Sequence, residues 1–418
     1  MNNRDISREP NRVRVVNILT SSLTVRFLEG QPEYFENKGF EIVVVSSPGD
    51  ELGKVQRNGA RTVAIPMARE ISLWRDVLSL WRIWRVLSRL RPAITNVATP
   101  KAGLLGGIAA WTCRIPCRYY TLIGLRCETT TGFKRKLLLL TERIACMCAH
   151  QVICVSESLR LKARDLGIVS AERAWVLGPG SCNGVDTEEF APRVETLRRA
   201  EQLRLQLGIP ADAPVLGFVG RLTRDKGIAE LVEAYSKLRE RFPELRLLLV
   251  GEVEEADPLP PETYRLIARE SQIIHTGFVK DPVPYYHMMD VLALPTHREG
   301  FPNAVLEAHA SGKPVVAARS TGVVDAVIDG TTGVLVPIGD ARALAEALEV
   351  VLADEGLGVS LGAAGRERVL REFRREMVWD AIIQRYLQQL RNKGMSVPSL
   401  AVQQVVTTAM SSSSIVSR

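Results

Sequence analysis

The sequence lacks any long hydrophobic run. Among its 418 residues no uninterrupted apolar stretch approaches the roughly 20 residues that cross a bilayer. The polar start, MNNRDISREPNR, has no apolar core of the kind found in signal peptides. These two absences argue against a membrane-spanning or secreted class, and we expect the protein to remain in the cytoplasm.

Cysteine and histidine are few, and neither shows the spacing of a metal site. All seven cysteines fall between Cys113 and Cys182, no histidine precedes His150, and neither residue type shows a metal-site spacing. We therefore expect no metal cofactor and interpret the cysteines as reduced, buried thiols. The remaining histidines are interpreted as structural side chains: His275, His287, His297 and His309.

The composition is that of an ordinary globular protein. Hydrophobic residues make up 46% of the chain and charged residues 24%, which excludes a disordered polypeptide. The 418 residues exceed the roughly 250 to 300 that one core serves, so two domains are expected. The net charge of +7 favours an anionic partner, such as a sugar nucleotide, an acidic membrane surface or a nucleic acid.

Short β-branched runs alternate with helical patterns along almost the whole chain. This alternation predicts parallel sheets covered by helices. The first series of predicted strands covers 13–20, 41–46, 61–66, 93–98, 117–124, 151–156 and 174–178. The second series covers 215–220, 245–251, 273–279, 291–295, 314–318 and 334–336. We therefore predict an α/β protein with two Rossmann-like, doubly wound domains that face a cleft.

A polar stretch with three prolines, residues 183–215, separates the two series and places the domain junction within 183–213. We divide the chain into a first domain over 11–190 and a second over 191–376. The Ser-rich end, 394–418, is expected to be a flexible tail. Ligands of such folds bind beyond the carboxyl ends of the strands, so the site is expected between the domains.

The segment VLGFVGRLTRDKGIAELVEAY predicts a buried strand, a turn at Gly220, and a helix that begins near Gly227 with Asp225 as N-cap. Lys226 would then lie at a helix N-terminus, where a cation opposes the positive end of the dipole. A bound anion relieves that conflict, and Arg221 adds a charge suited to phosphate. The alternative interpretation is a solvated basic turn.

The second motif, PTHREGFPNAVLEAHASGKP, predicts a loop followed by a helix over 302–311. Glu299 lies on the loop and Glu307 within the helix, and both carboxylates can face one ligand. Exposed amides would meet a diphosphate at the helix N-terminus, where unpaired N–H groups and the dipole favour anions: those of Asn303, Ala304 and Val305. The alternative is a solvated loop glutamate and a capping glutamate.

These motifs resemble a known family. GRLTRDKG, EGFPNAVLE and DGTTGVLVPIGD, in this order, resemble the donor domain of the fourth sequence family of glycosyltransferases. Upstream, SSLTVRFLEGQ, TPKAGLLGG, ERIACMCAHQVICVSESLR and GPGSCNGVD are similar to the acceptor half of its capsular, exopolysaccharide and O-antigen branch. The resemblance covers nearly the whole chain. Each motif is weak alone, but their order and spacing are highly specific.

The resemblance implies the GT-B fold and a retaining glycosyltransferase. The enzyme would move a sugar from a nucleotide-diphosphate donor, UDP-linked in our interpretation, to a glycan or a polyprenyl-diphosphate-linked acceptor. Family members need no bound metal, and this sequence has no Asp-x-Asp triplet. As in relatives, a helix over about 377–391 is expected to cross back and complete the first domain.

The resemblance also assigns roles to donor-side residues. Arg221 and Lys226 would bind the diphosphate, and Glu307 the ribose hydroxyls. Glu299 would hold the transferred sugar, and it forms the catalytic set with Arg221 and Lys226. Further donor contacts would come from strand ends and from the loop before the helix: Gly220, Gly277, Phe278, Val279, Gly300, Phe301 and Pro302.

The acceptor half departs from the family's pattern in two places. The chain has LIG at 122–124, where many relatives carry His or Arg before the glycine, and NVATP at 96–100, where many have His-x-His-Thr-Pro. We assign no catalytic base in this half. Lys101 is a possible cation of the cleft on the acceptor side, and the alternative is a solvated lysine at a helix start. Two alternatives therefore stay open, a non-catalytic sugar-nucleotide-binding partner subunit and a sugar-nucleotide epimerase of the same fold. Dispersed arginines and the lack of a reader motif argue against nucleic acid.

The segment WRDVLSLWRIWRVLSRLRP predicts an amphipathic helix. One interpretation is a crossover helix that packs its apolar side on the first sheet: Trp74, Val77, Leu78, Trp81 and Trp84. The other is peripheral contact with an anionic membrane, on the inner face of the cell membrane, in which the basic side lies on headgroups: Arg75, Arg82 and Arg89.

Overall fold

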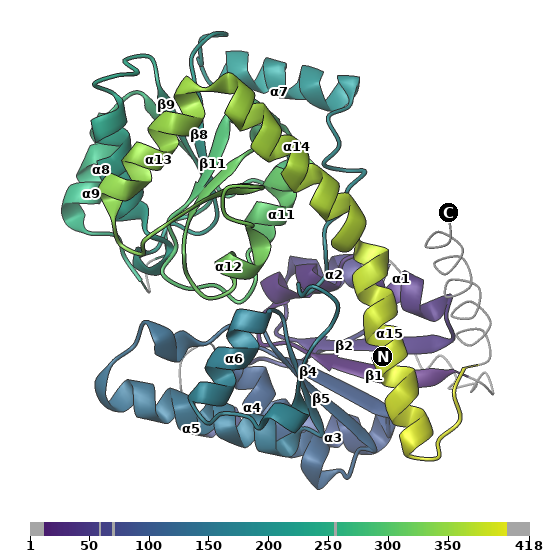
Figure 1. Ribbon diagram of the computed structural model, residues 1–418. Helices are drawn as coiled ribbons and strands as arrows, with labels where there is room; N and C mark the ends of the chain where they lie inside the picture. Colours follow the sequence, from purple (N-terminus) through teal and green to yellow (C-terminus); the bar gives the residue numbers. More distant parts are fainter. Residues whose placement is uncertain (1–11, 58–59, 69–71, 255–256, 399–418) are drawn as a thin grey trace.

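The computed structural model describes residues 12–57, 60–68, 72–254 and 257–398. Within these ranges the chain forms two parallel sheets, each with helices on both faces (Figure 1). The polar start of the sequence, up to residue 11, lies outside the described residues. So does the expected flexible tail beyond residue 398.

The first sheet has seven parallel strands in the order β3-β2-β1-β4-β5-β6-β7. They are β1 (Val13–Ile18), β2 (Phe40–Ser46), β3 (Arg61–Ala64), β4 (Ile94–Ala98), β5 (Cys117–Leu122), β6 (Gln151–Cys154) and β7 (Ala174–Val176). Each begins within one residue of its predicted start. Five of them end two residues early, because their last residues turn out of the sheet into the loops at its carboxyl edge.

The second sheet has six parallel strands in the order β10-β9-β8-β11-β12-β13. They are β8 (Val215–Val219), β9 (Arg246–Val250), β10 (Ile273–Gly277), β11 (Val291–Leu294), β12 (Val315–Ala318) and β13 (Gly333–Val336). In both sheets the strand order reverses beside the first strand, which is the place where doubly wound folds bind ligands. The predicted α/β class with two Rossmann-like, doubly wound sheets is confirmed.

Helices cover both faces of the first sheet. One face carries α3 (Leu73–Leu90), α4 (Pro100–Thr112) and α5 (Gly132–Cys148). The other carries α1 (Gln31–Glu36) and α15 (Arg375–Asn392). The edges and connections hold α2 (Asp50–Arg57), α6 (Glu157–Asp165), and the 3-10 turns η1 (Ser22–Leu28), η2 (Arg126–Glu128) and η3 (Ala171–Arg173).

The second sheet is covered in the same way. On one side α8 (Ile228–Leu238), α9 (Pro261–Arg269) and α13 (Ala341–Ala353) pack together. On the other lie α7 (Val194–Gln206), α10 (Val283–Met288), α11 (Asn303–Ala310) and α14 (Glu355–Glu372). The turn η4 (Arg224–Lys226) and the short helix α12 (Val323–Ala326) occupy the loops at the carboxyl edge.

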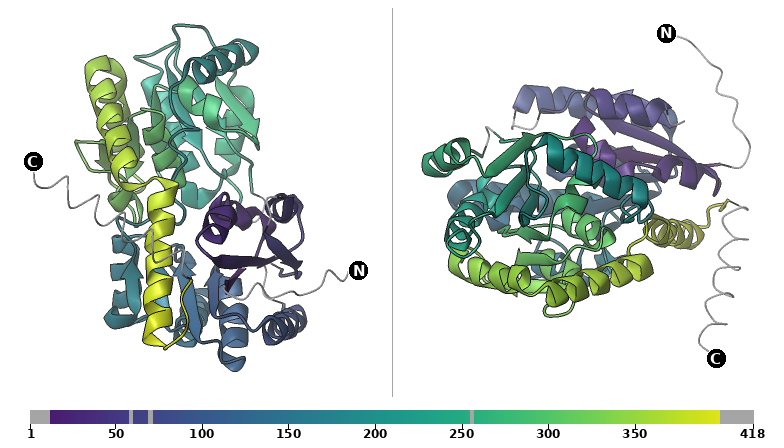
Figure 2. Two further views of the ribbon diagram at one scale, coloured as in Figure 1. Left: turned by 90° about the vertical axis from the view of Figure 1, so that its right-hand side faces the viewer. Right: turned by 90° about the horizontal axis from the view of Figure 1, so that it is seen from above.

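The chain returns to the first sheet through its last helix. Figure 2 shows α14 beside the second sheet and α15 beside the first, nearly end to end. The expected crossing helix corresponds to α15, whose Trp379 and Tyr386 are buried on the first sheet. The Tyr386 ring lies 4.8 Å from that of Tyr119 on β5. The side chain of Trp379 donates a hydrogen bond of 2.6 Å to Asn183, which begins the connection between the two sheets.

Candidate functional site

The loops that follow the strands of one sheet contact the corresponding loops of the other. The hydroxyl of Ser156, after β6, donates a hydrogen bond of 2.7 Å to the carbonyl oxygen of Gly300, after β11. Thr321, after β12, donates one of 2.7 Å to the carboxylate of Glu128, after β5. The carboxyl edges of the two sheets therefore face each other, as expected for a site between two doubly wound units. The first unit is the first sheet with its helices, and the second unit is the second sheet with its helices.

The β11–α11 loop, residues 295–302, fits closely against the first unit. A Cβ atom at Gly300 would overlap the carbonyl oxygen of Ile123, and one at Gly322 would overlap the carbonyl oxygen of Gly300. Glycine is required at these positions because two backbones approach each other directly. The loop that carries Glu299 is thereby fixed between the units.

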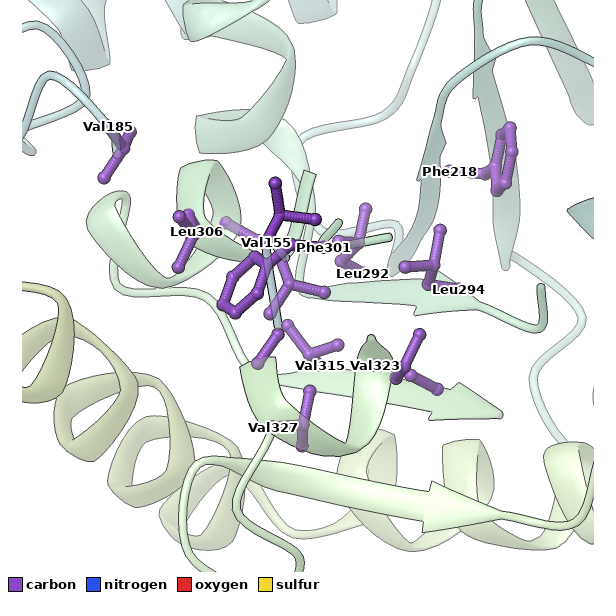
Figure 3. Close-up of a cluster of buried hydrophobic side chains, with 14 of the residues drawn as sticks. Val155, Val185, Phe218, Leu292, Leu294, Phe301, Leu306, Val315, Val323 and Val327 are labelled. Atoms are coloured by element: carbon purple, nitrogen blue, oxygen red, sulfur yellow. The ribbon is translucent and has the colours of Figure 1, made fainter. Parts of the chain in front are cut away.

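Phe301 holds this loop through its ring. The ring is buried 5.3 Å from that of Phe373 and belongs to a hydrophobic cluster that runs across both units. Figure 3 shows it beside Val155 of the first unit and Leu306 of the second. We expected Phe301 to help position the sugar and phosphate, but its ring points into the core, so its side chain acts on the loop instead.

Lys226 and Glu299 form an ion pair across two loops of the second unit. Only 16% of either side chain is exposed. The sequence placed these residues 73 positions apart on separate motifs, and the structure brings them together. A cation and a carboxylate at one partly buried point can hold the two polar ends of a sugar phosphate.

A second ion pair lies beside the first. Arg298 donates a hydrogen bond of 2.6 Å to Asp225 and another of 2.9 Å to Thr129 of the first unit. Burial alone would raise the pKa of Asp225. The hydroxyl of Thr223 and the nearby positive charges outweigh this effect and lower the pKa, so Asp225 stays ionised.

Three cations converge on this region. The charges of Arg298, Lys226 and Arg221 all act on the Asp225 carboxylate. Arg221 is the most exposed of the three and forms an ion pair with Glu254. Each of the three cations is paired with one carboxylate in this structure, and a doubly charged diphosphate could take the place of such a carboxylate partner.

The turn before α8 differs from the prediction. Residues 224–226 form the 3-10 turn η4, Gly227 adopts a positive φ of 71°, and α8 begins only at Ile228. Asp225 is therefore not the N-cap, and Lys226 is not in the first turn of the helix. A Cβ at Gly227 would overlap the carbonyl oxygen of Pro295, so glycine lets the turn reach the β11–α11 loop.

The N-terminus of α11 also differs in detail. Pro302 is the N-cap, not the first helical residue, and α11 spans Asn303–Ala310. The amide of Val305 donates to the carbonyl oxygen of Pro302 at 3.1 Å, so the expectation of an exposed amide there is wrong. Asn303 and Ala304 are partly exposed and remain the candidates for an anion.

Glu307 projects from the middle of α11 toward α10. The hydroxyl of Tyr286 donates to its carboxylate at 2.6 Å. Burial raises the pKa of Glu307, while the bond from Tyr286 and the charges of Arg375 and Arg26 act to lower it. A carboxylate so placed has a second oxygen for ligand hydroxyl groups.

The strand ends expected at the nucleotide base come together. Gly220 follows β8, Gly277 ends β10, and a Cβ at Gly277 would meet open space. Phe278 is half exposed, and the guanidinium of Arg26 from the first unit lies 5.1 Å from the centre of its ring. Val279 packs against the core and supports this edge. An aromatic face and an arginine can enclose a planar base.

His297 and His275 form hydrogen bonds within the fold, and His287 and His309 are buried. His297 bonds Glu230 at 2.8 Å, which raises the pKa of His297, and its backbone amide donates to the backbone carbonyl oxygen of Asp225. His275 bonds the carbonyl oxygen of Gly251 at 2.8 Å. Burial lowers the pKa of His287 and of His309 to about 4, so both are neutral at pH 7.

The cysteines are unpaired thiols, five of them buried. Within the described residues no group of three or more His, Cys, Asp or Glu side chains could hold a metal ion. Among the same residues, no helix is both long and apolar enough to span a membrane.

The first unit has a small recess at the carboxyl ends of β1, β4 and β5. Its polar lining includes Asn17, Asn96 and Thr121, and the Thr121 hydroxyl donates to Asn96 at 2.8 Å. Ile123, whose carbonyl touches Gly300, also lines it. Lys101 does not, because its ammonium is held 2.8 Å from Asp76 on α3.

Some residues of the site could not be assigned from the sequence. Arg298 and Asp225 stand inside the motifs, yet their mutual bond depends on the 3-10 turn. Tyr286 and Arg26 lie outside the donor motifs and reach the site only through the packing of α10 and η1. A weak signal existed for Arg26, the only cation in SSLTVRFLEGQ.

Two family models match the chain. Glycosyl transferases group 1 matches residues 213–354, and Glycosyl transferase 4-like domain matches residues 26–180. The chain is 35% identical to the capsular polysaccharide biosynthesis glycosyltransferase CapM of Staphylococcus aureus, over 89% of this chain and 96% of CapM. It is 27% identical to the UDP-Gal:alpha-D-GlcNAc-diphosphoundecaprenol alpha-1,3-galactosyltransferase of Escherichia coli, over 86% and 92%.

Solved structures share the fold. HepE of Anabaena, in complex with UDP-glucose, aligns with a TM-score of 0.76 at 20% identity, over 90% of this chain and 100% of HepE. Sucrose-phosphate synthase of Thermosynechococcus elongatus aligns with a TM-score of 0.75 at 22% identity, over 91% and 100%. Both likenesses cover the two sheets together, and they confirm the expected GT-B architecture.

Proposed function

Since this chain belongs to the glycosyl transferases group 1 and is a glycosyltransferase, we propose that it transfers a sugar from a UDP-linked donor to a glycan or lipid-linked acceptor during synthesis of a surface polysaccharide. CapM, which matches along nearly its whole length, is named for capsular polysaccharide biosynthesis. The galactosyltransferase relative is named for a UDP-Gal donor and a diphosphoundecaprenol-linked acceptor. HepE was solved with UDP-glucose. These names support the donor and the acceptor class.

One observation carries the proposal, namely the ion pair of Lys226 and Glu299 on the loop that leads into α11. The donor diphosphate is bound by Lys226, by Arg221 and by the amides of Asn303 and Ala304 at the helix N-terminus. Glu299, released from Lys226 by the phosphate, accepts hydrogen bonds from hydroxyls of the transferred sugar. As charge develops on the leaving diphosphate, these fixed donors stabilise it without a metal ion.

The nucleoside occupies the neighbouring strand ends. Glu307, held by Tyr286, accepts the ribose hydroxyls through its second oxygen. The base lies along Gly277, Phe278 and Val279, closed from the first unit by Arg26. In this arrangement the second domain, 191–376, binds the donor.

The first domain, 11–190 with the crossing helix over 377–391, presents the acceptor. The recess at the ends of β1, β4 and β5 opens beside Gly300 through Ile123, so an acceptor bound there reaches the sugar held by Glu299. The amide and hydroxyl groups that line the recess can form hydrogen bonds with a sugar, and its apolar walls can pack against the C–H face of a sugar ring.

The proposed chemistry retains the anomeric configuration. The acceptor hydroxyl attacks the anomeric carbon on the face that the diphosphate leaves, through an oxocarbenium-like state. The new C–O bond forms as the bond to the phosphate oxygen breaks, and the hydroxyl proton passes to the departing phosphate. Ile123, which faces Gly300, cannot act as a base, so the leaving group is the available proton acceptor.

A donor panel tests the proposal. Thermal stabilisation and sugar release are measured with UDP-, GDP- and ADP-sugars, and we expect UDP-sugars to give the largest response in both. Stabilisation by UDP-sugars without hydrolysis or transfer would instead identify a binding subunit that lost its chemistry. Epimerised nucleotide sugar would identify the epimerase alternative.

A further inference from the structure

The outward surface of α3 is apolar. Trp74, Trp81 and Trp84 are exposed on it, together with Val77 and Leu78. The sequence interpretation in which these side chains pack on the first sheet is therefore wrong. Isolated exposed apolar residues are normal, but a contiguous line of three tryptophans marks a binding surface.

A different stripe of α3 forms the core contact. Ser79, Ile83 and Leu87 are buried against the sheet, with Val86 and Leu90 packed beside them. The helix is thus apolar on two sides, and the sheet takes the stripe with the branched aliphatic side chains. The tryptophan stripe is left without a partner within the described residues.

The surface continues over the neighbouring helices. α4 lies between α3 and α5, in contact with both, and exposes Trp111 in its last turn. On α5 the exposed large apolar residues recur every seven positions: Phe133, Leu140 and Met147. Figure 1 shows the three helices side by side, on the side of the first sheet away from the second unit. We call the outward surface of α3, α4 and α5 the docking face.

The docking face concentrates positive charge. The three helices contain nine Lys and Arg residues and two acids, a net charge of +7 that equals that of the whole chain. Neither acid is available to solvent as a free charge, because Asp76 pairs with Lys101 and Glu142 is buried against the Tyr120 hydroxyl.

The arginines of α3 lie beside its tryptophans. Arg85 stacks 5.3 Å from the centre of the Trp81 ring. Arg75, Arg82 and Arg89 follow the tryptophan line at helical spacing, and within the described residues none of the three forms an ion pair. Tryptophan with unpaired arginine is the combination that binds the interface between headgroups and acyl chains.

The docking face reaches the carboxyl edge of the first sheet. The two most exposed large apolar side chains, Trp74 at 87% and Phe133 at 81%, lie in the first turns of α3 and α5. In a parallel α/β unit these turns follow the carboxyl ends of the strands. This end of the face therefore lies at the carboxyl edge of the first sheet, whereas the acceptor recess is on the opposite face of that sheet, beside α1 and α15.

We propose that the docking face rests on an anionic phospholipid bilayer, with tryptophan and phenylalanine rings among the acyl chains and arginines on the headgroup phosphates. Charge decides between this occupant and a second copy of the chain. Two docking faces brought together would oppose +7 with +7, whereas an anionic bilayer supplies the complementary charge.

Flotation of the full chain with vesicles tests this inference. Phosphatidylcholine vesicles are compared with vesicles that also contain phosphatidylglycerol, across a series of salt concentrations. We expect recovery mainly with the anionic vesicles and a decline as salt rises, since exposed charges are screened. Equal recovery with both vesicle types would overturn the inference.

Two double variants test whether the arginines of α3 carry the binding to vesicles. Reversing Arg82→Glu and Arg85→Glu together should lower binding to anionic vesicles more than about twentyfold, because each basic residue near such a surface contributes roughly five-fold. The matched control reverses two arginines of the second unit, Arg342→Glu and Arg371→Glu, with the same change in net charge. Equal losses in the two reversals would overturn the inference.

Tryptophan substitutions test the apolar part. Trp74→Ala with Trp81→Ala should reduce recovery, whereas Trp175→Ala, at an exposed tryptophan beside Arg385 of α15, should not.

Sedimentation of the same proteins tests the alternative occupant, a second copy of the chain. A dimer that dissociates in the Trp74 and Trp81 variant with unchanged flotation would assign the face to a second copy and overturn the inference. Donor hydrolysis, measured without vesicles, should persist in all variants, so a failure here is distinct from a failure of the proposed function.

Discussion

Lys226 and Glu299 are oppositely charged, mostly buried and directly paired, which makes each sensitive to the other's loss. Lys226→Ala removes the proposed phosphate contact, and we expect kcat/KM to fall by about 10²- to 10³-fold, as when one preorganised donor to a developing charge is removed. Steady-state transfer assays measure the effect. Lys237→Ala, which removes an exposed lysine paired on α8, should leave the rate unchanged. A similar rate for both variants would refute the phosphate assignment.

Glu307 allows a second test on a single side chain. Glu307→Gln keeps the size of the side chain but loses the charge proposed to receive the ribose hydroxyls. We expect the KM for the donor to rise about tenfold with kcat little changed, because a hydrogen bond to a charged group is worth about 1.5 to 3 kcal/mol. Tyr286→Phe should give a smaller change in the same direction, since it removes only the bond that orients the carboxylate. An unchanged KM in Glu307→Gln would show that the ribose binds elsewhere.

For single residues, the sequence predicted which side chains lie together in the site. The hydrogen bonds between them depend on the fold and could not be predicted. The two motifs indicated that Lys226 and Glu299 serve one ligand, and the structure places them in contact. The sequence did not indicate that Asp225 would bind Arg298, because that requires a 3-10 turn where the pattern favoured a helix start. Nor did it show that the Val305 amide is already bonded to Pro302.

The β11–α11 loop is the element on which the site depends. Gly300→Ala would force a methyl group into the carbonyl of Ile123 and push the units apart. We expect strong loss of transfer with little loss of secondary structure, measured by activity and circular dichroism. Gly53→Ala in α2, where the nearest atom is 3.7 Å away on a flexible side chain, is the control. Full activity of Gly300→Ala would mean that this close approach is not needed.

His297 on the same loop forms an ion pair with Glu230, which should make the free energy of unfolding depend on pH. The bond between His297 and Glu230 raises the pKa of His297 above 6.5 and lowers that of Glu230 below 4.5. The His297 contribution is therefore present below pH 6.5 and is lost as pH rises through the raised value. The Glu230 contribution is present above pH 4.5 and is lost as pH falls through the lowered value.

His297→Gln should thus lower the free energy of unfolding most between these limits, near pH 5.5 to 6, by about 1 kcal/mol. The difference from the unchanged chain should narrow toward alkaline pH. Denaturant titrations at several pH values measure it. A difference that stays constant or grows above pH 8 would contradict the assigned ion pair.

Prediction of whole elements succeeded for strands and was ambiguous for α3. Parallel strands buried on both faces are continuous apolar runs, so their starts were readable to within one residue. In α3 two apolar stripes compete, and the pattern alone cannot indicate which one meets the sheet. The structure buries Ile83 and Leu87 and exposes the tryptophans.

Across the whole molecule, one carboxylate from the second unit caps a helix of the first. Asp325 on α12 accepts bonds from the amides of Glu157 and Ser158 at 3.1 and 3.2 Å, and from the Ser158 hydroxyl. These amides begin α6 and have no partner within their own helix. A negative charge at this end is also favoured by the helix dipole.

Asp325→Ala should therefore loosen the contact between the units. We expect a larger radius of gyration by small-angle scattering and a weaker donor response. The control is Asp340→Ala, which removes the N-cap of α13 within the second unit alone. If both variants keep the unchanged radius, the Asp325 contact does not hold the units together.

The arrangement of two sheets followed from the sequence, because the chain is longer than one core usually serves and a polar stretch with three prolines separates two series of strands. The relation between the units could not be derived in this way. It depends on backbone contacts such as Gly300 with Ile123 and on the Phe301 ring shared by both units, neither of which has a periodic signal. The return of α15 was expected only from the resemblance.

The most direct measurement of the donor-site assignment is a crystal structure of this chain with a UDP-sugar. We predict that phosphate oxygens bond the Lys226 ammonium and the amides of Asn303 and Ala304, with sugar hydroxyls on Glu299 and ribose hydroxyls on Glu307. A diphosphate bound away from Lys226 and the start of α11 would contradict it.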